Sequence, residues 1–313
     1  MKTIRLLPPE TRVLLKEETR RKLFSDKDRT AKKLKIKRKS VNNWIRGDFR
    51  PSLEQLKKLG MNLTSESFFT NIEEFGLGKS KFDFKLPSEI ELNKVSWLLG
   101  IMEGDRAESK NAGIGLTNEN EDLIKEFITN LEIFNLDKKD FRLKIQITNG
   151  GDIDKEKFSK KFELPFNRIT ISRSEIPRKS PVIQIILKSK IFAEIFRRLN
   201  EIILSSKEVD NETKSKFIKG FCDAEGSVNS KKLTIEIKQK NTSQGKELIS
   251  NVSNMLNSLN IQNKINGPNC ENMLVIRLFG GKKNLENLKR FSTLIGFVSS
   301  EKQEKLNKIL QNS

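Results

Sequence analysis

The sequence predicts an α+β protein in which one structural unit occurs twice, preceded by a small all-α segment. Three observations support this fold class. A motif of apolar residues, glycine and acids occupies residues 97–105 and recurs at 217–226, 120 residues later. The elements expected after each copy follow the same order, and the first 60 residues carry a separate, basic helical pattern. A pattern repeated in register indicates two copies of one folding unit.

Both copies of the motif end an apolar helix on acidic residues. The first copy reads WLLGIMEGD and the second FIKGFCDAEG, so that Asp105 and Glu225 close the two helices. Two carboxylates that are brought together can hold a divalent metal ion. The motif therefore makes these two acids the first candidates for a functional site.

The elements after each motif follow from the alternation of apolar and polar residues. After Glu225 we expect strands at 232–239 and 273–278 and helices at 245–259, 284–291 and 301–310. After Asp105 we expect strands at 113–118, 141–147 and 181–187 and helices at 121–134 and 189–200. Residues 148–180 expand the first unit. Each unit thus combines helices with a sheet, which is an α+β arrangement.

The composition restricts the possible chemistry. The chain has 60 Lys and Arg against 41 Asp and Glu, a net charge of +19, which favours polyanionic partners, nucleic acid first. It has no His and no Tyr, which excludes Ser-His-Asp and Cys-His catalysis, His-ligated zinc and Tyr nucleophiles. With two cysteines, the chain has too few for a disulfide framework or a cysteine zinc site. Hydrolysis would then depend on carboxylates, lysines, amides and a hard metal ion.

No apolar run approaches the length of a membrane span and no signal peptide is visible, so we expect a soluble, intracellular protein with no membrane partner. The 313 residues are enough for two or three domains. The expected boundaries are an amino-terminal domain at 1–62, a linker at 63–90, a first unit at 91–209 and a second unit at 210–313.

The amino-terminal segment reads as three short helices. Residues 1–60 contain 19 basic and 7 acidic residues, so much of the excess positive charge lies there. A helix at 28–35, a turn at 36–38, a helix at 39–47 that Gly47 ends, and a helix beginning after Pro51 resemble the helix-turn-helix of phage repressors. In that geometry the second helix lies in the major groove of DNA. The residues that would contact DNA are Arg38, Lys39, Ser40, Asn42, Asn43 and Arg46. A plain three-helix bundle with a basic surface is the alternative, and Trp44 is expected in its core.

From residue 90 onward the chain resembles the LAGLIDADG homing endonucleases in their single-chain, two-motif form. The resemblance depends on Leu98–Asp105, on Ile218–Gly226 and on the segment around 295–303. It implies a pseudo-two-fold core of two αββαββα-like units whose sheets form a saddle over double-stranded DNA. The two motif helices would pack closely through Gly100 and Gly220. A monomer with internal pseudo-symmetry is then expected.

The resemblance also implies the site residues. Asp105 and Glu225 would ligate Mg²⁺, for which Mn²⁺ could substitute, and two carboxylates with metal ions can stabilise both oxygens of an in-line phosphodiester hydrolysis. Gln239 and its counterpart Asn118 would position water, and Lys302 would be the active-site lysine, with Lys207 as a guess for its twin. Lys238 and Lys240 would contact DNA from the sheet.

The chain departs from the family pattern after the first motif, where Arg106 stands in place of the usual glycine. That departure puts one of the two metal sites in doubt. Glu103 and Asp223, two residues before the candidate ligands, are expected to cap helix ends or form ion pairs rather than ligate metal.

The expected function is a site-specific, Mg²⁺-dependent DNA endonuclease that cuts across the minor groove. Two alternatives use the same scaffold: a catalytically silent DNA-binding transcriptional regulator, or an RNA maturase that assists intron folding. An intein is disfavoured, because the sequence begins with Met1 rather than a nucleophilic Cys or Ser and contains no His.

Overall fold

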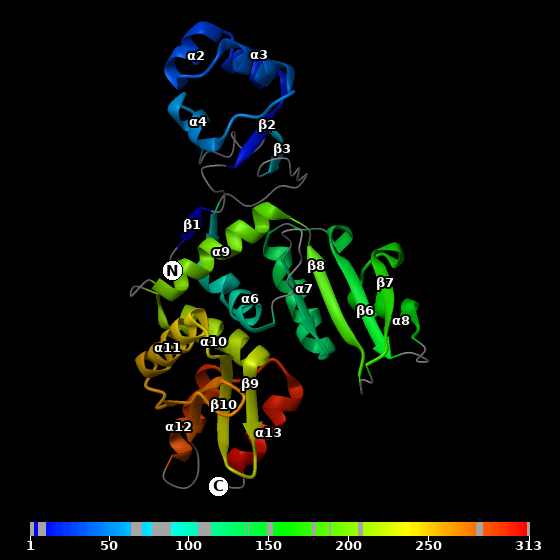
Figure 1. Ribbon diagram of the computed structural model, residues 1–313, viewed down its shortest axis with the longest axis vertical. Helices are drawn as coiled ribbons and strands as arrows, with labels where there is room; N and C mark the ends of the chain where they lie inside the picture. The colour runs from blue at the N-terminus through cyan, green and yellow to red at the C-terminus, as the bar shows by residue number, and fades with distance from the viewer. Residues whose placement is uncertain are drawn as a thin grey trace.

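A computed structural model shows two α+β units and, at one end of the long axis, a separate amino-terminal lobe (Figure 1). The structure describes residues 3–5, 11–63, 71–76, 89–105, 114–134, 136, 138–148, 153–176, 180–187, 189–205, 209–279 and 284–311. Arg106 and Lys207, named above, lie outside these residues. In the described part of the chain, no helix is long and apolar enough to cross a membrane.

The lobe, here called the amino-terminal module, comprises residues 11–63 and 71–76. Its elements are β2 (Arg12–Leu15), α1 (Glu17–Leu23), α2 (Lys27–Leu34), α3 (Arg38–Arg46), α4 (Leu53–Lys58) and β3 (Ile72–Gly76). After α2, Lys35 adopts a left-handed conformation (φ 53°) that turns the chain toward α3, and Gly47 (φ 85°) ends α3. Ser52 and Gln55 form a capping box at α4. The three helices α2, α3 and α4 therefore lie where the sequence predicts them.

Two strands belong to this region although the sequence predicted only helices there. Strands β2 and β3 pair antiparallel, so part of the expected linker 63–90 forms a sheet with the start of the module. A second short pair joins β1 (Thr3–Arg5) to β4 (Glu89–Glu91), which lies directly before the first motif helix. Strands of three to five residues carry little period-2 signal, which explains why the sequence did not indicate them.

The first unit has four strands among its described residues. Its elements are α6 (Leu92–Asp105), β5 (Ile114–Asn118), α7 (Glu121–Leu131), β6 (Arg142–Thr148), α8 (Lys155–Phe162), β7 (Ile169–Ser174), β8 (Val182–Leu187) and α9 (Lys190–Ser205), with 3-10 turns at Glu132–Phe134, Lys138–Asp140 and Phe166–Arg168. The strand order is β5-β8-β6-β7. Strand β8 runs antiparallel to β5 and β6, whereas β7 runs parallel to β6 at the edge. Of the strand expected at 113–118, residues 114–118 are described, and they form β5.

The second unit repeats this plan more compactly. Its elements are α10 (Asn211–Glu225), β9 (Gly226–Asn229), β10 (Thr234–Lys240), α11 (Ser243–Ser258), β11 (Lys264–Asn266), β12 (Met273–Phe279), α12 (Leu285–Leu294) and α13 (Ser300–Gln311). The strand order is β11-β12-β10-β9, with antiparallel neighbours throughout. The three neighbouring strands β5, β8 and β6 of the first unit correspond to β10, β12 and β11 of the second. Helix α8 and strand β7 form the expansion predicted between residues 148 and 180.

The motif helices α6 and α10 pack against each other through glycine. A Cβ atom on Gly100 would lie 2.0 Å from the carbonyl oxygen of Phe217, and a Cβ on Gly220 would lie 2.0 Å from that of Trp97. Trp97 and Phe217 each lie three residues before the glycine of their own helix, so the contact is reciprocal. A side chain at either glycine would force the helices apart. The expected close packing of the two motif helices is confirmed.

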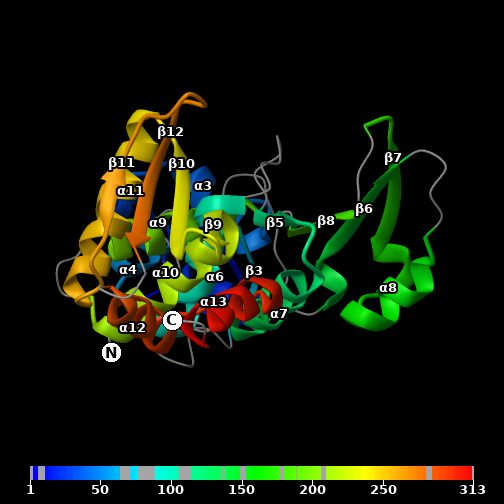
Figure 2. The same cartoon turned by 90° about the horizontal axis from the view of Figure 1, so that it is seen from below.

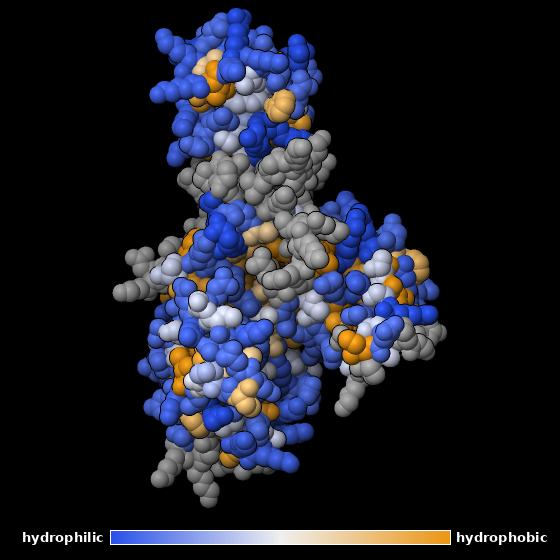
Figure 3. All heavy atoms as spheres, in the orientation of Figure 1, coloured by the Kyte–Doolittle hydropathy of each residue, from blue (hydrophilic) through white to orange (hydrophobic). Residues whose placement is uncertain are grey.

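The two sheets are well separated from each other in Figure 2, with β10 and β12 on the left and β6 and β7 on the right. Inward-facing residues of each sheet are apolar, as Ile235 and Ile237 show on β10, and the opposite positions are more exposed. In Figure 3 the visible face of the amino-terminal module is mostly hydrophilic, with small separate apolar patches. The fold thus places the two helix ends, and with them the candidate acids, between two exposed sheet faces.

Candidate active site

Asp105 and Glu225 are the last residues of α6 and α10, and the close helix packing brings them together. Gly104 lies against the other helix, because a Cβ there would meet the Cβ of Ala224 at 2.4 Å and the Cγ of Glu225 at 2.8 Å. The Glu225 side chain therefore passes directly over the residue beside Asp105. The two carboxylates are close enough for repulsion from Asp105 to raise the pKa of Glu225.

Asp105 has a fixed orientation. The side-chain amide of Asn118, the last residue of β5, donates a hydrogen bond of 2.6 Å to its Oδ2. Burial raises the pKa of Asp105, and the Asn118 bond and the Lys302 charge oppose that rise. Asn118 also accepts a hydrogen bond from the backbone N–H of Asn120, the N-cap of α7. One amide thus joins the acid to the start of the next helix.

Glu225 is held less firmly. Burial, together with repulsion from Asp105, raises its pKa to about 7, and the charge of Lys302 opposes the rise. Within the described part of the chain, its carboxylate has neither a hydrogen bond nor an ion pair. A carboxylate that is largely removed from water without a partner is costly in its ionised form. Glu225 is therefore the more strongly perturbed of the two acids.

Lys302, on α13, supplies the positive charge of the site. Its Nζ donates hydrogen bonds to the backbone carbonyls of Asp223 (2.6 Å) and Cys222 (3.2 Å), near the end of α10. Burial lowers its pKa, and the carboxylates of Asp223, Asp105 and Glu225 act in the opposite direction. The ammonium group is thus anchored to the helix end and faces all three acids.

Asp223 has a structural role that the sequence did not define. Its carboxylate accepts hydrogen bonds from the indole N–H of Trp97 (2.9 Å) and from the backbone N–H groups of Val298 (2.9 Å) and Ser299 (3.1 Å). It therefore joins α6, α10 and the segment that leads into α13. Burial raises its pKa, and these hydrogen bonds oppose the rise. The corresponding Glu103 accepts a hydrogen bond from the Asn200 amide.

Gln239 lies apart from the site formed by Asp105, Asn118 and Lys302. Those three line a hollow of about 570 Å³, whereas Gln239 lines a second one of about 590 Å³ together with Glu103. Its Oε1 accepts a hydrogen bond from the backbone N–H of Lys240. Thr242 is the N-cap of α11, and Asn120 is the N-cap of the equivalent helix α7. Gln239 lies three residues before its cap, and the residue three before Asn120 is Thr117. The expected counterparts Gln239 and Asn118 are therefore offset by one residue.

The candidate DNA contacts of the module lie on α3. Arg38, Lys39 and Arg46 are exposed and Ser40, Asn42 and Asn43 are partly exposed, whereas Val41 and Trp44 are buried. The core position expected for Trp44 is confirmed. Arg38 also forms an ion pair of 3.4 Å with Asp28. On β10, Lys238 is partly exposed and Lys240 is exposed.

An ion pair on the second sheet escaped the sequence analysis. Glu236 on β10 lies opposite Arg277 on β12, and the guanidinium donates to Glu236 Oε1 at 2.7 and 2.8 Å. Both residues occupy alternating positions of their predicted strands. The signal was available only once the register between the strands was known.

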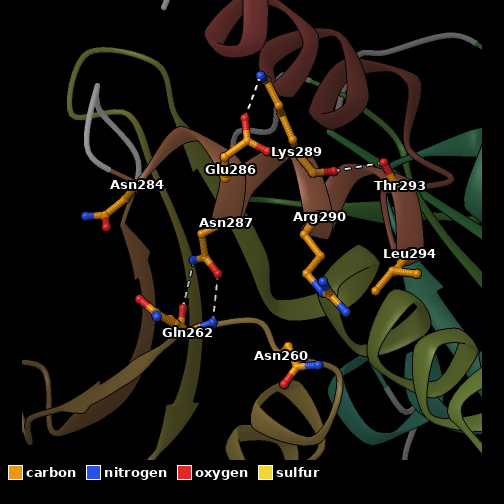
Figure 4. A pocket seen from close by; sticks show the side chains of 9 residues that line it. All are labelled: Asn260, Gln262, Asn284, Glu286, Asn287, Lys289, Arg290, Thr293 and Leu294. Carbon is orange, nitrogen blue, oxygen red and sulfur yellow. Dashed lines mark hydrogen bonds and ion pairs between the residues drawn. The ribbon is translucent and has the colours of Figure 1, made fainter.

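A further hollow of about 620 Å³ lies away from the acids, beside α12 (Figure 4). Several of its polar side chains already have partners: Asn287 bonds to the backbone of Gln262, and Lys289 bonds to Glu286. Arg290 donates from Nε to the carbonyl of Leu259 at the end of α11. The volume is similar to that of the acid site, but the chemistry described above is absent from it, so we assign the site to the acids.

Comparison with known proteins bears on the fold. Residues 212–296 match the family described as the LAGLIDADG-like domain. No curated protein sequence matches the chain. Mesophilic variants of the homing endonuclease I-DmoI are similar in structure, with a TM-score of 0.43 and 18% identity over 64% of this chain and 96% of theirs.

Two further solved structures are similar to a comparable degree. I-DmoI in complex with DNA and Mn has a TM-score of 0.42 and 20% identity over 66% of this chain and 97% of its own. Full-length DUF199/WhiA from Thermatoga maritima has a TM-score of 0.43 and 14% identity, covering 71% and 60%. This chain is therefore an α+β protein whose helix-and-sheet unit occurs twice, and residues 212–296, in its second unit, match the LAGLIDADG-like domain.

Proposed function

We propose that the protein is a divalent-metal-dependent endonuclease that cuts double-stranded DNA at a specific site, across the minor groove. The single observation that carries the proposal is the pair of crowded carboxylates, Asp105 and Glu225, at the adjoining ends of two motif helices. The charge of Asp105 raises the pKa of Glu225, and the charge of Lys302 acts on the pKa of both acids. Such a group of perturbed acids and a lysine is typical of sites for hydrolysis.

The chain's own residues fit a hard divalent cation. Glu225 is unpartnered within the described residues, and burial and Asp105 raise its pKa to about 7. A cation beside the two carboxylates would offset their repulsion, and oxygen ligands are those that Mg²⁺ and Mn²⁺ prefer. No cluster of three or more possible metal-binding side chains occurs within the described ranges. Water and phosphate oxygens would therefore complete the coordination, as is usual for Mg²⁺.

Each side chain then has a defined task. When bound, the metal supplies stabilisation of charge on the phosphate oxygens and activation of water. Asn118 fixes the orientation of Asp105, because its amide donates to the acid. The Lys302 ammonium, fixed by two carbonyls, places a positive charge beside the acids where a phosphate would lie. Asp223 holds α13, and with it Lys302, against the helix ends.

The strands provide a surface for the DNA backbone. Across β5 to β12 they contain seven basic residues and one acid, Glu236, which is paired with Arg277. The basic residues are Arg142, Lys144, Arg173, Lys238, Lys240, Lys264 and Arg277. This excess of positive charge between the acids and the sheet edges suits a polyanion that crosses both units.

The amino-terminal module adds a second basic surface. Exposed Lys39 and Arg46 lie on α3, which follows a tight turn after α2. This arrangement supports the placement of α3 in a major groove, with Ser40, Asn42 and Asn43 toward base edges. The module would then contribute to affinity and to the choice of target.

The test begins with full-length protein and a duplex selected from a randomised library. With Mg²⁺ the wild type should cut the selected duplex. The variants Glu225→Gln and Asp105→Asn should bind it within about two-fold of wild type and cut at least about a thousand-fold more slowly, since both oxygens of the displacement lose their metal. Glu304→Gln, a change to an exposed acid on α13 that makes none of the contacts described above, is the matched control and should cut normally.

Two outcomes would contradict the proposal and identify its replacements. Protection of the selected duplex without cutting in Mg²⁺ or Mn²⁺ would favour a DNA-binding regulator. Preference for structured intron RNA over that duplex in a competition assay would favour a maturase.

A further inference from the structure

We infer that two covalent connections hold the amino-terminal module to the core, so that the protein binds one duplex through two subsites at a fixed spacing. One subsite belongs to the module and the other to the duplicated core. The inference rests on the proposed DNA binding and adds a constraint on the geometry of the target. It comes from the order in which the short strands pair.

The module is inserted between two strands that pair with each other. Strand β1 precedes the module and β4 follows it, and the two are antiparallel neighbours, with Arg5 opposite Glu89. Within the module, Arg12 at the start of β2 lies opposite Gly76 at the end of β3. On the core side, the chain therefore leaves and returns at neighbouring residues. On the module side, it also enters and leaves at neighbouring residues.

The shorter connection limits the separation of the two parts. Residues 6–10 join Arg5 to Thr11, and a chain of this length spans at most about 21 Å. Residues 77–88 join Gly76 to Glu89 and would span up to about 45 Å. One turn of B-DNA is about 34 Å long. Thr11 therefore stays within about 21 Å of Arg5, a distance shorter than one turn of a duplex.

Two connections also restrict rotation. A module on a single linker can turn about that linker, whereas two connections that start from paired residues oppose such turning. Binding by module and core to one duplex is then an intramolecular event whose gain in affinity depends on a matching span. A target with the wrong spacing or the wrong helical phase should lose the contribution of the module.

The first experiment measures spacing. Duplexes selected from a randomised library with full-length protein are footprinted, and DNA is inserted between the module segment and the core segment of the protected region. Insertions of about five and about ten base pairs, half a turn and one turn, should each weaken binding at least about ten-fold. Affinity that stays within two-fold of the uninterrupted duplex would overturn the inference.

The second experiment asks which connection sets the spacing. A Gly-Ser insert of about ten residues is placed within 6–10 in one variant and within 77–88 in another, with helical content checked by circular dichroism. The insert in 6–10 should remove most of the penalty for the longer duplexes, and the insert in 77–88 should not. The opposite result would mean that the module hangs on one linker, and the inference would be wrong.

Substitutions assign the subsites and separate the two proposals. Lys39→Ala combined with Arg46→Ala should remove protection from the module segment only, and Lys308→Ala on α13 is the control that should leave the footprint unchanged. Selected duplexes that are protected over the core segment alone would refute this inference and leave the endonuclease proposal standing. Failure to retain any duplex from the library would refute both.

Discussion

The two units share one backbone plan, but their acids have different surroundings. Asp105 in the first unit receives a hydrogen bond from Asn118, and Glu225 in the second has no such partner among the described residues. Lys302 comes from the second unit and is fixed to carbonyls at the end of α10. The duplication thus preserves the position of the acids and lets their supporting side chains differ. Backbone symmetry alone does not produce two equal half-sites.

The interface glycines test the part of the comparison that is symmetric. Gly100→Ala and Gly220→Ala should each destabilise the protein by about 3 kcal/mol or more, because the added methyl group would meet a backbone oxygen. Urea unfolding should give similar losses for the two variants. Gly60→Ala, where the structure shows open space, is a control for loss of glycine, although its positive φ adds a smaller cost. A large difference between the two interface variants would contradict a reciprocal contact.

Asp223 and Glu103, two residues before the candidate metal ligands, test where the two units differ. Asp223→Ala should cost about 2–3 kcal/mol, because it leaves the buried Trp97 indole N–H and the backbone N–H groups of Val298 and Ser299 without acceptors. Glu103→Ala removes the acceptor of the Asn200 amide at the equivalent position of α6 and is the comparison variant. Chemical denaturation compares the two directly. Equal losses would show that the Asp223 hydrogen bonds contribute little.

The metal-free protein should become less stable as the pH rises. The pKa of Glu225 is raised to about 7 in the folded state from an ordinary value of 4.5, so the folded protein binds the proton more tightly. The stabilisation by this proton is fully present below about 4.5 and is lost as the pH passes through about 7. We expect the free energy of unfolding to fall by about 1–2 kcal/mol between pH 5 and 8. Thermal unfolding in the presence of EDTA measures this loss.

Glu225→Gln should flatten that pH dependence, because the amide does not ionise. Asp105→Asn should shift the loss to lower pH, because it removes the repelling charge. If the slope persisted in Glu225→Gln, another group would be its source.

The smallest expected effect concerns the amide side chains. Asn118→Ala should slow cutting of the selected duplex about five-fold or more, because Asp105 loses its orienting donor. Gln239→Ala should change the rate less than two-fold, since Gln239 lines the other hollow. Single-turnover rates with saturating enzyme distinguish these effects from changes in binding. Equal effects would restore the equivalence that the family resemblance implied.

Much of the fold could be predicted from the sequence. The two motifs are local patterns that end helices on Asp105 and Glu225, and the core strands alternate clearly enough to be located. The sequence could not supply register. Asn118 and Gln239 were matched because both lie near the ends of predicted strands. The N-caps of the following helices, Asn120 and Thr242, show that the two residues occupy positions that differ by one.

Long-range partners were also beyond the sequence. Asp223 could be named as a structural residue, but the groups that donate hydrogen bonds to its carboxylate lie 75 or more positions away in the chain. The pairing of β1 with β4 involves three residues on each side, and so short a strand has no pattern of its own. Contacts of this kind depend on how whole units pack, which local propensity does not encode.

The passage of one polypeptide from α9 into α10 has an evolutionary consequence. In a dimer of identical subunits every substitution appears on both sides, and the preferred duplex must read alike on its two strands. Here each half can change alone, as the lone Asn118 amide and the extra strand β7 show. Under the proposed DNA binding, such a protein is free to acquire a non-palindromic target one half at a time.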